Sequence, residues 1–352
     1  MSKKALLIIG EQKISRLRAH ISFCKFVKYA RKLSQNNKKL ELAVISYRQL
    51  FAAQLPSLKA PRIIVVLFFP YQYWNSQIEV YGDGRIYGDL IFGKKFRRFF
   101  TNVERRIASC YPDKTVTYLN HPRACYLDRD KQASKTLLKA KAIPTPRSFK
   151  ASSFSDIRRL LEKNLTVYIK PRFGSMGKGI TFASKEGVIS NFISRRGRPA
   201  SRPSDFNWRF VQVRKPSGFI NRLLKKGFIC EQAVPPLLFK GRRFDFRVYV
   251  IFGRVVYLYA KSSPETFLVT NWSQGGRIDK KKRILSTIPR HNINRIKRLA
   301  QEAAQALRLN FAGIDIIFSR DFKQAYVLEG NAFPGYEKGF DLIKCLATRL
   351  VK

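Results

Sequence analysis

The sequence is short of the side chains that build most metal centres and nucleophilic active sites. Its 352 residues include only three histidines and five cysteines. No two cysteines form a CxxC pair, which argues against a disulfide framework and against a zinc site. Scattered, odd-numbered cysteines fit a reducing compartment, so we expect the protein to be cytoplasmic. The cysteines are Cys24, Cys110, Cys125, Cys230 and Cys345.

The sequence also has no long hydrophobic run. The longest, at residues 63–69, is about a third of the ~20 residues that a transmembrane helix requires, so we expect no transmembrane segment. The apolar stretch at residues 5–10 is short and is followed at once by Glu11 and Lys13. It therefore predicts a first β-strand rather than a signal peptide.

Acidic residues are scarce. Lysine and arginine number 69 against 23 aspartates and glutamates, a net charge of +46. Such a field attracts anions, including nucleotides, nucleic acid, acidic polymers and lipid surfaces. The basic residues are spread along the chain, and residues 190–226 and 277–298 are dense in them. A polyanionic partner and a general compositional bias explain this charge equally well.

What is present has the composition of an ordinary globular protein, with 45% hydrophobic residues. Strand-like and helix-like segments alternate through residues 1–120, which predicts an N-terminal α/β domain. A break at Pro122 begins a second region, residues 121–352. We divide it into residues 121–227, which contain a Gly-rich loop and a basic segment interpreted as a mobile or partner-facing insertion, and residues 228–352, which carry candidate metal ligands.

Three oxygen-bearing side chains are predicted to converge in a hairpin at residues 313–329. A turn centred near residues 320–323 places Asp315 opposite Glu329, and Asn331 falls on the same face because side chains alternate along a strand. Carboxylates directly opposite each other repel, and Mg²⁺, which prefers oxygen ligands, would remove that penalty. Ion pairs with nearby basic residues are the alternative. The uncharged Asn331 favours a metal.

A glycine-rich loop follows an apolar strand that ends in Lys170 and Pro171. Its glycines free backbone N–H groups to approach phosphate oxygens. The order of the glycines matches neither a Walker A loop nor GxGxxG, so by itself the loop is better explained as an ordinary flexible turn. Lys170 is less ordinary, because an ammonium at the end of an apolar strand points toward a cleft. The loop consists of Gly174, Ser175, Met176, Gly177, Lys178 and Gly179.

Three further segments have the composition of ligand-contacting positions. Glu231 and Gln232 end a strand, where a carboxylate and backbone amides can meet an adenine and a ribose, although exposed strand ends are commoner. Asp245 and Arg247 share a strand face, either as a surface pair or with Arg247 aimed at a phosphate or carboxylate. Asn271 lies in a loop that by itself is an ordinary turn.

Taken in order, these residues resemble the ATP-grasp superfamily, across roughly residues 120 to 340. The motifs DFR, TNxxxGG, GID and ExN are most similar to ligases that add glutamate to proteins or small acids, and to spore coat-associated ATP-grasp proteins. One departure is Gly330, where relatives carry a bulkier residue. The matching positions are Asp130, Lys131, Lys170, Pro171, the loop at residues 174–179, Glu231, Gln232, Asp245, Arg247, Asn271, Gly275, Gly276, Asp315, Glu329 and Asn331.

The resemblance implies an α/β protein with an ATP-grasp fold behind an N-terminal pre-ATP-grasp domain. It implies that Lys131 and Lys170 contact the phosphates of ATP, and that the Gly-rich loop closes over them. Glu231 and Gln232 would hold adenine. Arg247 and Asn271 would lie near the transferred phosphoryl group, as would Lys170. The implied ligands of one or two Mg²⁺ ions, with Mn²⁺ as an alternative, are Asp315, Glu329 and Asn331.

The implied activity is that of a ligase. ATP activates a carboxylate as an acyl phosphate, and an amine or similar nucleophile then displaces phosphate. A chain without a visible nucleophilic triad suits this chemistry, because phosphoryl transfer depends on positioning and charge neutralisation. The basic field favours an acidic substrate. The alternatives are a phosphotransferase on the same fold, a nucleic-acid or polyanion binder, and a structural coat protein with residual ATP binding. The sequence does not indicate an oligomeric state.

Overall fold

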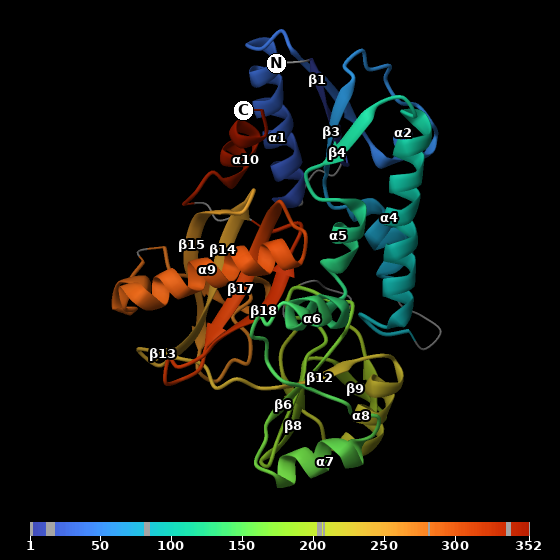
Figure 1. Ribbon diagram of the computed structural model, residues 1–352. Helices are drawn as coiled ribbons and strands as arrows, with labels where there is room; N and C mark the ends of the chain where they lie inside the picture. The colour runs from blue at the N-terminus through green and yellow to red at the C-terminus, as the bar shows by residue number, and fades with distance from the viewer. Residues whose placement is uncertain are drawn as a thin grey trace.

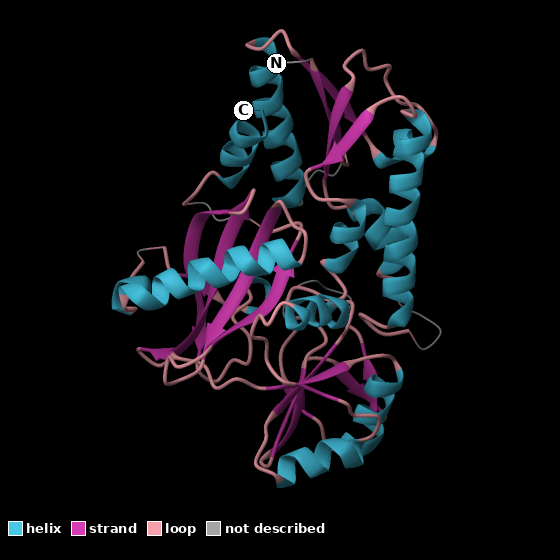
Figure 2. Ribbon diagram, in the orientation of Figure 1, coloured by secondary structure: helices cyan, strands magenta, loops and turns pink. Residues whose placement is uncertain are grey.

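The computed structural model describes residues 3–11, 18–80, 85–202, 206, 208–280, 282–335 and 339–351. Three main β-sheets, each with its own helices, succeed one another along the chain. Figure 1 shows the first sheet at one end of the molecule and the second at the opposite end, with the third beside them and α10 next to α1. Figure 2 shows that all three parts mix helices and strands. The predicted α/β class is confirmed.

A four-stranded parallel sheet forms the N-terminal part, in the order β2-β1-β3-β4. Its central strands are buried because their Ile/Val/Leu runs are covered on both faces. The strands expected at residues 5–10 and 63–69 are confirmed, whereas the helix expected from residue 14 begins outside the described residues. The elements are β1 (Lys4–Ile9), α1 (Arg18–Gln35), β2 (Leu40–Ile45), α2 (Tyr47–Phe51), β3 (Arg62–Leu67), α3 (Tyr71–Tyr73), the π-helix η1 (Trp74–Ile78), α4 (Leu90–Cys110) and β4 (Thr115–Tyr118).

A six-stranded sheet forms the second part, in the order β11-β8-β7-β6-β12-β5. Ser153 starts α7 with a reciprocal capping box to Asp156. The helix expected from residue 128 begins at Lys131, because Asp130 caps it. The elements are α5 (Pro122–Leu127), α6 (Lys131–Ala140), β5 (Ser148–Phe149), α7 (Phe154–Glu162), β6 (Val167–Lys170), β7 (Thr181–Ser184), β8 (Gly187–Ser190), β9 (Ile193–Arg195), β10 (Arg198–Ala200), β11 (Val211–Gln212), α8 (Pro216–Lys225) and β12 (Ile229–Gln232).

The basic segment at residues 190–226 is not the mobile insertion that its composition led us to expect. It supplies β9, β10, β11 and α8 to the second part of the fold. Phe192, Trp208 and Phe219 are at most 2% exposed and belong to the main core. The prediction of a mobile segment was wrong because the basic residues alternate with these apolar ones along ordinary helices and strands, while the partner-facing alternative stays a prediction. Four residues of the segment, 203–205 and 207, lie outside the described ones.

The third part is a sheet in the order β16-β15-β14-β17-β18, with β13 paired to β14. Alternate side chains of β14, from Phe244 to Val250, pack under α9 in an apolar core. On the opposite face, Asp245, Lys261 and Asp315 turn toward the second part, whereas Tyr249 and Ile251 are buried against the N-terminal part. The elements are β13 (Leu238–Phe239), β14 (Arg242–Ile251), β15 (Arg254–Pro264), η2 (Trp272–Gln274), β16 (Arg277–Ile278), η3 (Leu285–Thr287), α9 (Arg290–Ala306), β17 (Phe311–Phe318), β18 (Ala325–Asn331) and α10 (Leu342–Val351).

The helix α10 leaves the third sheet and returns to the N-terminal part. It packs against α1, with Leu346 and Ala347 buried in the same cluster as Phe26. The hydroxyl of Tyr29 donates to Asp341 at 2.6 Å, just before α10. Among the helices that the structure describes, none is both long and apolar enough to cross a bilayer.

Candidate functional site

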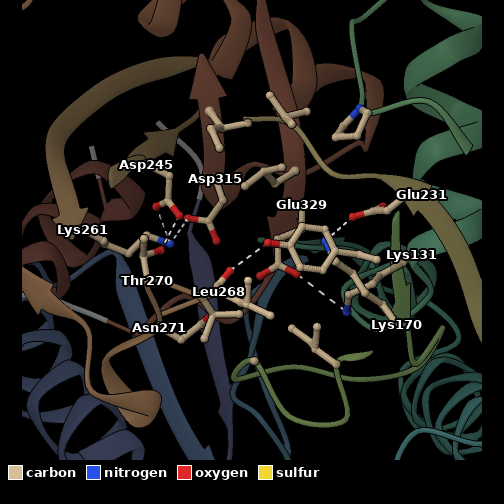
Figure 3. Close-up of a pocket in the computed structure, with 18 of the residues that line it drawn as sticks. Lys131, Lys170, Glu231, Asp245, Lys261, Leu268, Thr270, Asn271, Asp315 and Glu329 are labelled. Carbon is tan, nitrogen blue, oxygen red and sulfur yellow. Dashed lines mark hydrogen bonds and ion pairs between the residues drawn. The ribbon is translucent and has the colours of Figure 1, made fainter. Parts of the chain in front are cut away.

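A pocket lies between the second sheet and the polar face of the third (Figure 3). It gathers residues that are far apart in the sequence, including the Gly-rich loop. Three predicted site residues, Gly179, Arg247 and Asn331, are not part of its lining. The predicted residues that do line it are Lys131, Lys170, Gly174, Ser175, Met176, Gly177, Glu231, Gln232, Asn271, Asp315 and Glu329.

The C-terminal hairpin has the predicted register. Asp315 on β17 pairs with Glu329 on β18, and the next like-facing position pairs with Asn331. A Cβ on Gly330, between them, would come within 2.4 Å of Leu307 Cδ1. Gly330, the residue that departs from the family pattern, therefore leaves space for the side chain of Leu307, the C-cap of α9. The prediction that these side chains share one face of the sheet is confirmed.

The Asp315 carboxylate is buried and accepts hydrogen bonds from two basic side chains. Arg247, its neighbour on β14, donates from Nε to Oδ1 at 2.5 Å and from Nη2 to Oδ2 at 2.8 Å. Lys261 on β15 donates to Oδ1 at 3.0 Å. Burial raises the pKa of Asp315, but the charges of Arg247 and Lys261 outweigh it and hold that pKa well below its usual range. Asp315 is therefore an anion at neutral pH.

Asp245 is the second carboxylate on Lys261. Its Oδ1 lies 3.0 Å from the lysine Nζ, and its Oδ2 accepts a hydrogen bond from the Thr270 hydroxyl. Burial lowers the pKa of Lys261, but the two aspartates outweigh it and raise that pKa. Asp245 and Arg247 are thus not the surface pair that the sequence left open. Each is largely buried and paired to a neighbouring strand.

Asp315, Glu329 and Asn331 present a donor set that suits a hard cation. The two carboxylates face each other across the ladder, at a Cβ separation of roughly 5 Å. Asn331 donates from Nδ2 to the Gly313 carbonyl at 2.9 Å, so its Oδ1 is the amide atom left to bind a cation. Within the described residues no group of three or more His, Cys, Asp or Glu side chains is arranged to hold a metal. A cation here depends on the amide as its third protein ligand.

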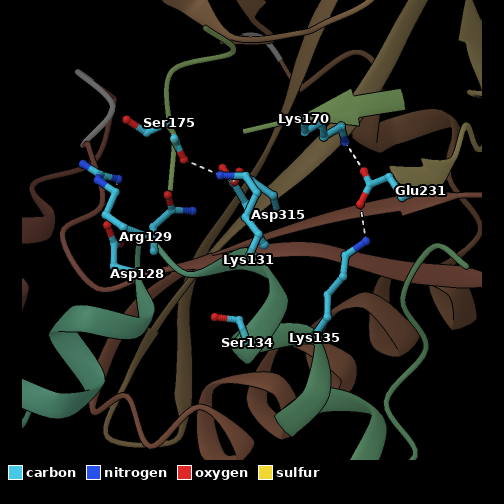
Figure 4. Close-up of polar contacts among 12 residues, drawn as sticks. Asp128, Arg129, Lys131, Ser134, Lys135, Lys170, Ser175, Glu231 and Asp315 are labelled. Carbon is cyan, nitrogen blue, oxygen red and sulfur yellow. Dashed lines mark hydrogen bonds and ion pairs between the residues drawn. The ribbon is translucent and has the colours of Figure 1, made fainter. Parts of the chain in front are cut away.

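Glu231 is buried between two lysines (Figure 4). Lys135 of α6 and Lys170 at the end of β6 both donate to its carboxylate. Burial raises the pKa of Glu231, but the two ammonium charges outweigh it and lower that pKa to about 2. This strand end is therefore not exposed. Its carboxylate is already satisfied by protein, and it orients Lys170 at the pocket.

Lys131 joins the Gly-rich loop to the predicted metal ligands. Its Nζ donates to the Gly174 carbonyl and lies 3.7 Å from Glu329 Oε2. The residue before it, Asp130, holds the Arg172 guanidinium with two hydrogen bonds of 2.6 and 2.7 Å. Burial lowers the pKa of Lys131. An ammonium is thus fixed at the point where the loop and the C-terminal hairpin meet.

The Gly-rich loop is anchored to the loop that contains Asn271. Ser273 and Gln274 donate to the Met176 carbonyl at 2.9 and 3.1 Å. A Cβ on Gly177 would come within 2.9 Å of Asn271 Oδ1, so only a glycine fits there. The two predicted loops therefore meet at one edge of the pocket. Left-handed backbone occurs in the loop at Met176 (φ 61°), Gly177 (φ 68°) and Gly179 (φ 73°).

The N-terminal domain also holds this loop. Tyr87 accepts a hydrogen bond from the Ser175 N–H at 2.9 Å and donates to the Ser175 carbonyl at 3.2 Å. Lys178, with its side chain 1% exposed, pairs with Glu79 at 2.5 Å, and its ammonium lies 4.2 Å from the centre of the Tyr87 ring. The lysine of the loop is thus committed to a domain outside the predicted ATP-grasp region.

Several site residues were missed at the sequence level, and two left a usable signal. In a hairpin that turns at residues 252–253, counting outward from the turn places Lys261 within one residue of the position opposite Asp245. The same counting paired Asp315 with Glu329 in the C-terminal hairpin. The structure pairs Asp245 with Lys261. Lys135 follows Lys131 by one helical turn and so shares its face. Glu79 left no signal, because it lies in another domain.

Comparison with known proteins shows which family this chain is similar to. A family model of YheC/D-like ATP-grasp proteins matches residues 132–343. A probable α-L-glutamate ligase of Haemophilus ducreyi is 29% identical over 234 residues, 66% of this chain and 63% of that protein. The tetrahydromethanopterin:α-L-glutamate ligase of Methanocaldococcus jannaschii is 25% identical over 228 residues, 64% of this chain and 65% of that protein. The chain thus aligns with less than two thirds of the length of these relatives.

A solved structure is similar over the whole chain. The ATP-grasp ligase PsnB, complexed with a phosphomimetic variant of a minimal precursor, Mg and ADP, superimposes with a TM-score of 0.57. The similarity covers 100% of this chain and 99% of that one, at 17% identity. At that identity the likeness establishes the fold.

Proposed function

The chain belongs to the YheC/D-like ATP-grasp family, and from this premise we propose that it is an ATP-dependent ligase that joins a carboxylate to an amine or a related nucleophile. The observation that carries the proposal is that one pocket gathers the Asp315–Glu329 face, the Lys131 ammonium and the Gly-rich loop. Oxygen ligands suit a phosphate-bound cation, and an ammonium with loop N–H groups suits the phosphates themselves.

We assign the nucleotide to this pocket. The triphosphate lies beside Lys131, Lys170 and the backbone N–H groups of the loop, and adenine lies at the strand end formed by Glu231 and Gln232. Because two lysines occupy the Glu231 carboxylate, the backbone of this strand, rather than the carboxylate, is proposed to meet the purine. The pocket supplies apolar surface for a purine from Tyr168, Val234, Pro236 and Leu328.

We assign Mg²⁺ to Asp315, Glu329 and the Oδ1 of Asn331. A bound Mg²⁺ supplies neutralisation of phosphate charge and polarisation of the phosphoryl oxygens. Mn²⁺ prefers similar oxygen donors and serves as a probe of the same site. The chain's own part is to hold these donors on one rigid sheet face and to keep Asp315 ionised.

In the proposed reaction a substrate carboxylate oxygen attacks the γ-phosphorus of ATP. The bond from that phosphorus to the β,γ-bridging oxygen breaks, and ADP leaves. The amine then attacks the carbonyl carbon of the acyl phosphate, loses a proton, and phosphate leaves with the C–O bond electrons. Lys131 and Arg247 oppose the negative charge that develops on the phosphoryl oxygens. No enzyme nucleophile is needed, because the substrate supplies it.

The acceptor is proposed to be acidic. The chain carries a net charge of +46, and a field of that sign concentrates anions. The two curated relatives are α-L-glutamate ligases by name, which supports glutamate or a similar amino acid as the incoming amine.

The proposal is tested by incubating the protein with ATP, Mg²⁺ and a cell extract and measuring product masses. A mass gain equal to one amino-acid residue, with an intermediate that hydroxylamine traps, is the expected result. A stable phosphate ester in its place would instead identify a phosphotransferase.

Glu329→Gln is the matched variant. We expect it to reduce ATP turnover at least ~100-fold, because it removes a charge from the site of phosphoryl transfer, with an unchanged far-UV circular dichroism spectrum. Glu302→Gln, on the exposed side of α9, is the control and should turn over ATP like the wild type. Equal turnover in both variants would refute the metal assignment.

A further inference from the structure

The proposed metal ligands contain a conflict. Asp315 is assigned to a cation, yet both of its oxygens already accept hydrogen bonds. Arg247 donates to Oδ1 and Oδ2, at 2.5 and 2.8 Å, and Lys261 donates to Oδ1 at 3.0 Å. Only 3% of Asp315 is exposed. A carboxylate offers about four lone-pair positions, and basic side chains fill most of them here.

A divalent cation on Asp315 would lie close to two positive charges. Repulsion at such separations is strong, and stronger where protein rather than water surrounds the charges. One of the two basic side chains therefore has to withdraw when the cation binds.

The contacts of Arg247 and Lys261 show which of the two side chains can withdraw from Asp315. Lys261 is fixed by a second carboxylate, because its Nζ also lies 3.0 Å from Asp245 Oδ1. Arg247 pairs with Asp315 and with no other carboxylate among the described residues. Its side chain lies against Gly313, where a Cβ would come within 3.1 Å of the arginine Cδ and Nη1. Release of Arg247 from Asp315 therefore breaks no second ion pair, whereas release of Lys261 would also separate it from Asp245.

We infer that Arg247 and the divalent cation exchange on Asp315, and that the released guanidinium binds the oxygens of the transferred phosphoryl group. This inference rests on the proposed function. The Arg247 guanidinium can bind either the Asp315 carboxylate or the phosphoryl group, because both present the same bidentate acceptor geometry. Lys261 stays in place and bridges the two aspartates. The exchange breaks no covalent bond and moves no proton.

The exchange links two requirements of the reaction. Without a cation, Arg247 neutralises Asp315 and is held away from the phosphates. With a cation bound, the same positive charge becomes available where negative charge develops. The free site should bind divalent cations more weakly than its two carboxylates and amide would allow, because Arg247 competes for Asp315.

Mn²⁺ binding to the full chain without nucleotide, measured by electron paramagnetic resonance, tests the exchange. Arg247→Met should bind Mn²⁺ about tenfold tighter than the wild type, because a like charge is removed beside the cation, while its ATP turnover falls. A residue with a purely structural role would weaken both. Arg247→Lys keeps the competing charge and should retain the wild-type Mn²⁺ affinity.

Arg254→Met is the control for charge removal alone. Arg254 is exposed and pairs with Ile251, which lies four residues along β14 and about 13 Å from Arg247, so the change should leave the Mn²⁺ affinity unchanged. Unchanged or weaker Mn²⁺ binding by Arg247→Met, with a wild-type circular dichroism spectrum, overturns the exchange. If Glu329→Gln abolishes Mn²⁺ binding in that case, the metal site stands and only the exchange fails. No Mn²⁺ binding by any of these proteins, with or without ADP, overturns both.

Discussion

At the scale of single residues, Glu231 is the position where we expect a substitution to reduce the stability of the fold most. One buried anion holds Lys135 and Lys170, and its removal leaves two ammonium groups facing each other away from water. We predict that Glu231→Gln lowers the free energy of unfolding by about 3–5 kcal/mol, the usual cost of breaking a buried pair. Denaturant unfolding measures it. The control is Glu162→Gln, in an exposed pair with Arg158, which should change stability by less than ~1 kcal/mol.

The pH dependence of this variant checks the cause. The pKa of Glu231 is about 2 in the folded protein, below its ordinary value of 4.5. A group with a lowered pKa stabilises the folded state above pH 4.5, and the contribution is lost as the pH falls from 4.5 toward 2. The difference in Tm between wild type and variant should be complete at pH 7 and should shrink below pH 4.5. A constant difference would point to packing instead.

At the scale of elements, the left-handed Gly177 joins the Gly-rich loop to the loop that contains Asn271. In Gly177→Ala, a residue with a Cβ would adopt φ 68° and approach Asn271 Oδ1 to 2.9 Å. We predict that the two loops separate and that the KM for ATP rises about tenfold, equivalent to ~1.4 kcal/mol of lost binding.

Gly218→Ala is the control for this prediction. Gly218 lies in α8 with nothing within 4 Å of its added Cβ, so the change should leave the KM unaltered and stabilise the helix by up to ~1 kcal/mol. Steady-state kinetics on both variants decide the matter. Equal KM values would mean that the junction of the two loops does not shape the nucleotide site.

Elements governed by local rules could be predicted from the sequence. The register of Asp315 and Glu329 followed from a turn position and the alternation of side chains, and the same rules reach Lys261 through Asp245. The start of α6 was misplaced because Asp130 serves as its cap rather than as part of it. The prediction that the basic segment at residues 190–226 is mobile was wrong for another reason. Composition does not show that Phe192 and Trp208 anchor this segment in the core.

At the scale of the whole molecule, the net charge of +46 is spread over several exposed helix faces. It is carried by residues such as Lys28 on α1, Arg97 on α4, Arg222 on α8 and Lys297 on α9. We predict that the protein binds polyanions with little sequence preference. Affinity for a mixed-sequence DNA duplex should fall about a thousandfold between 50 and 200 mM salt, as for a protein that contacts six or more phosphates.

Fluorescence anisotropy with a labelled duplex measures that slope. An affinity that does not change with salt, or no binding at 50 mM, would mean that the charge serves the pocket alone. Polyglutamate as a competitor separates a preference for nucleic acid from a general affinity for acidic chains.

The family resemblance could also be recognised from the sequence, and the family model and the fold confirm it. The contacts by which the N-terminal domain holds the Gly-rich loop could not be predicted from the sequence. Tyr87 and Glu79 hold the loop through Ser175 and Lys178, and these contacts exist only once two domains are packed together. Contacts between segments so far apart leave no periodicity or spacing in the chain.

The packing of α10 on α1 has a consequence for biosynthesis. The apolar surface around Leu6, Phe23 and Phe26 is completed by Leu346 and Leu350, which emerge from the ribosome more than three hundred residues after the first strand. Until then, the nascent N-terminal domain presents this surface to solvent while the rest of the chain is made. Exposed surface of this kind promotes aggregation and recruits chaperones. The newly made protein should therefore depend on chaperones, and a truncation before α10 should aggregate.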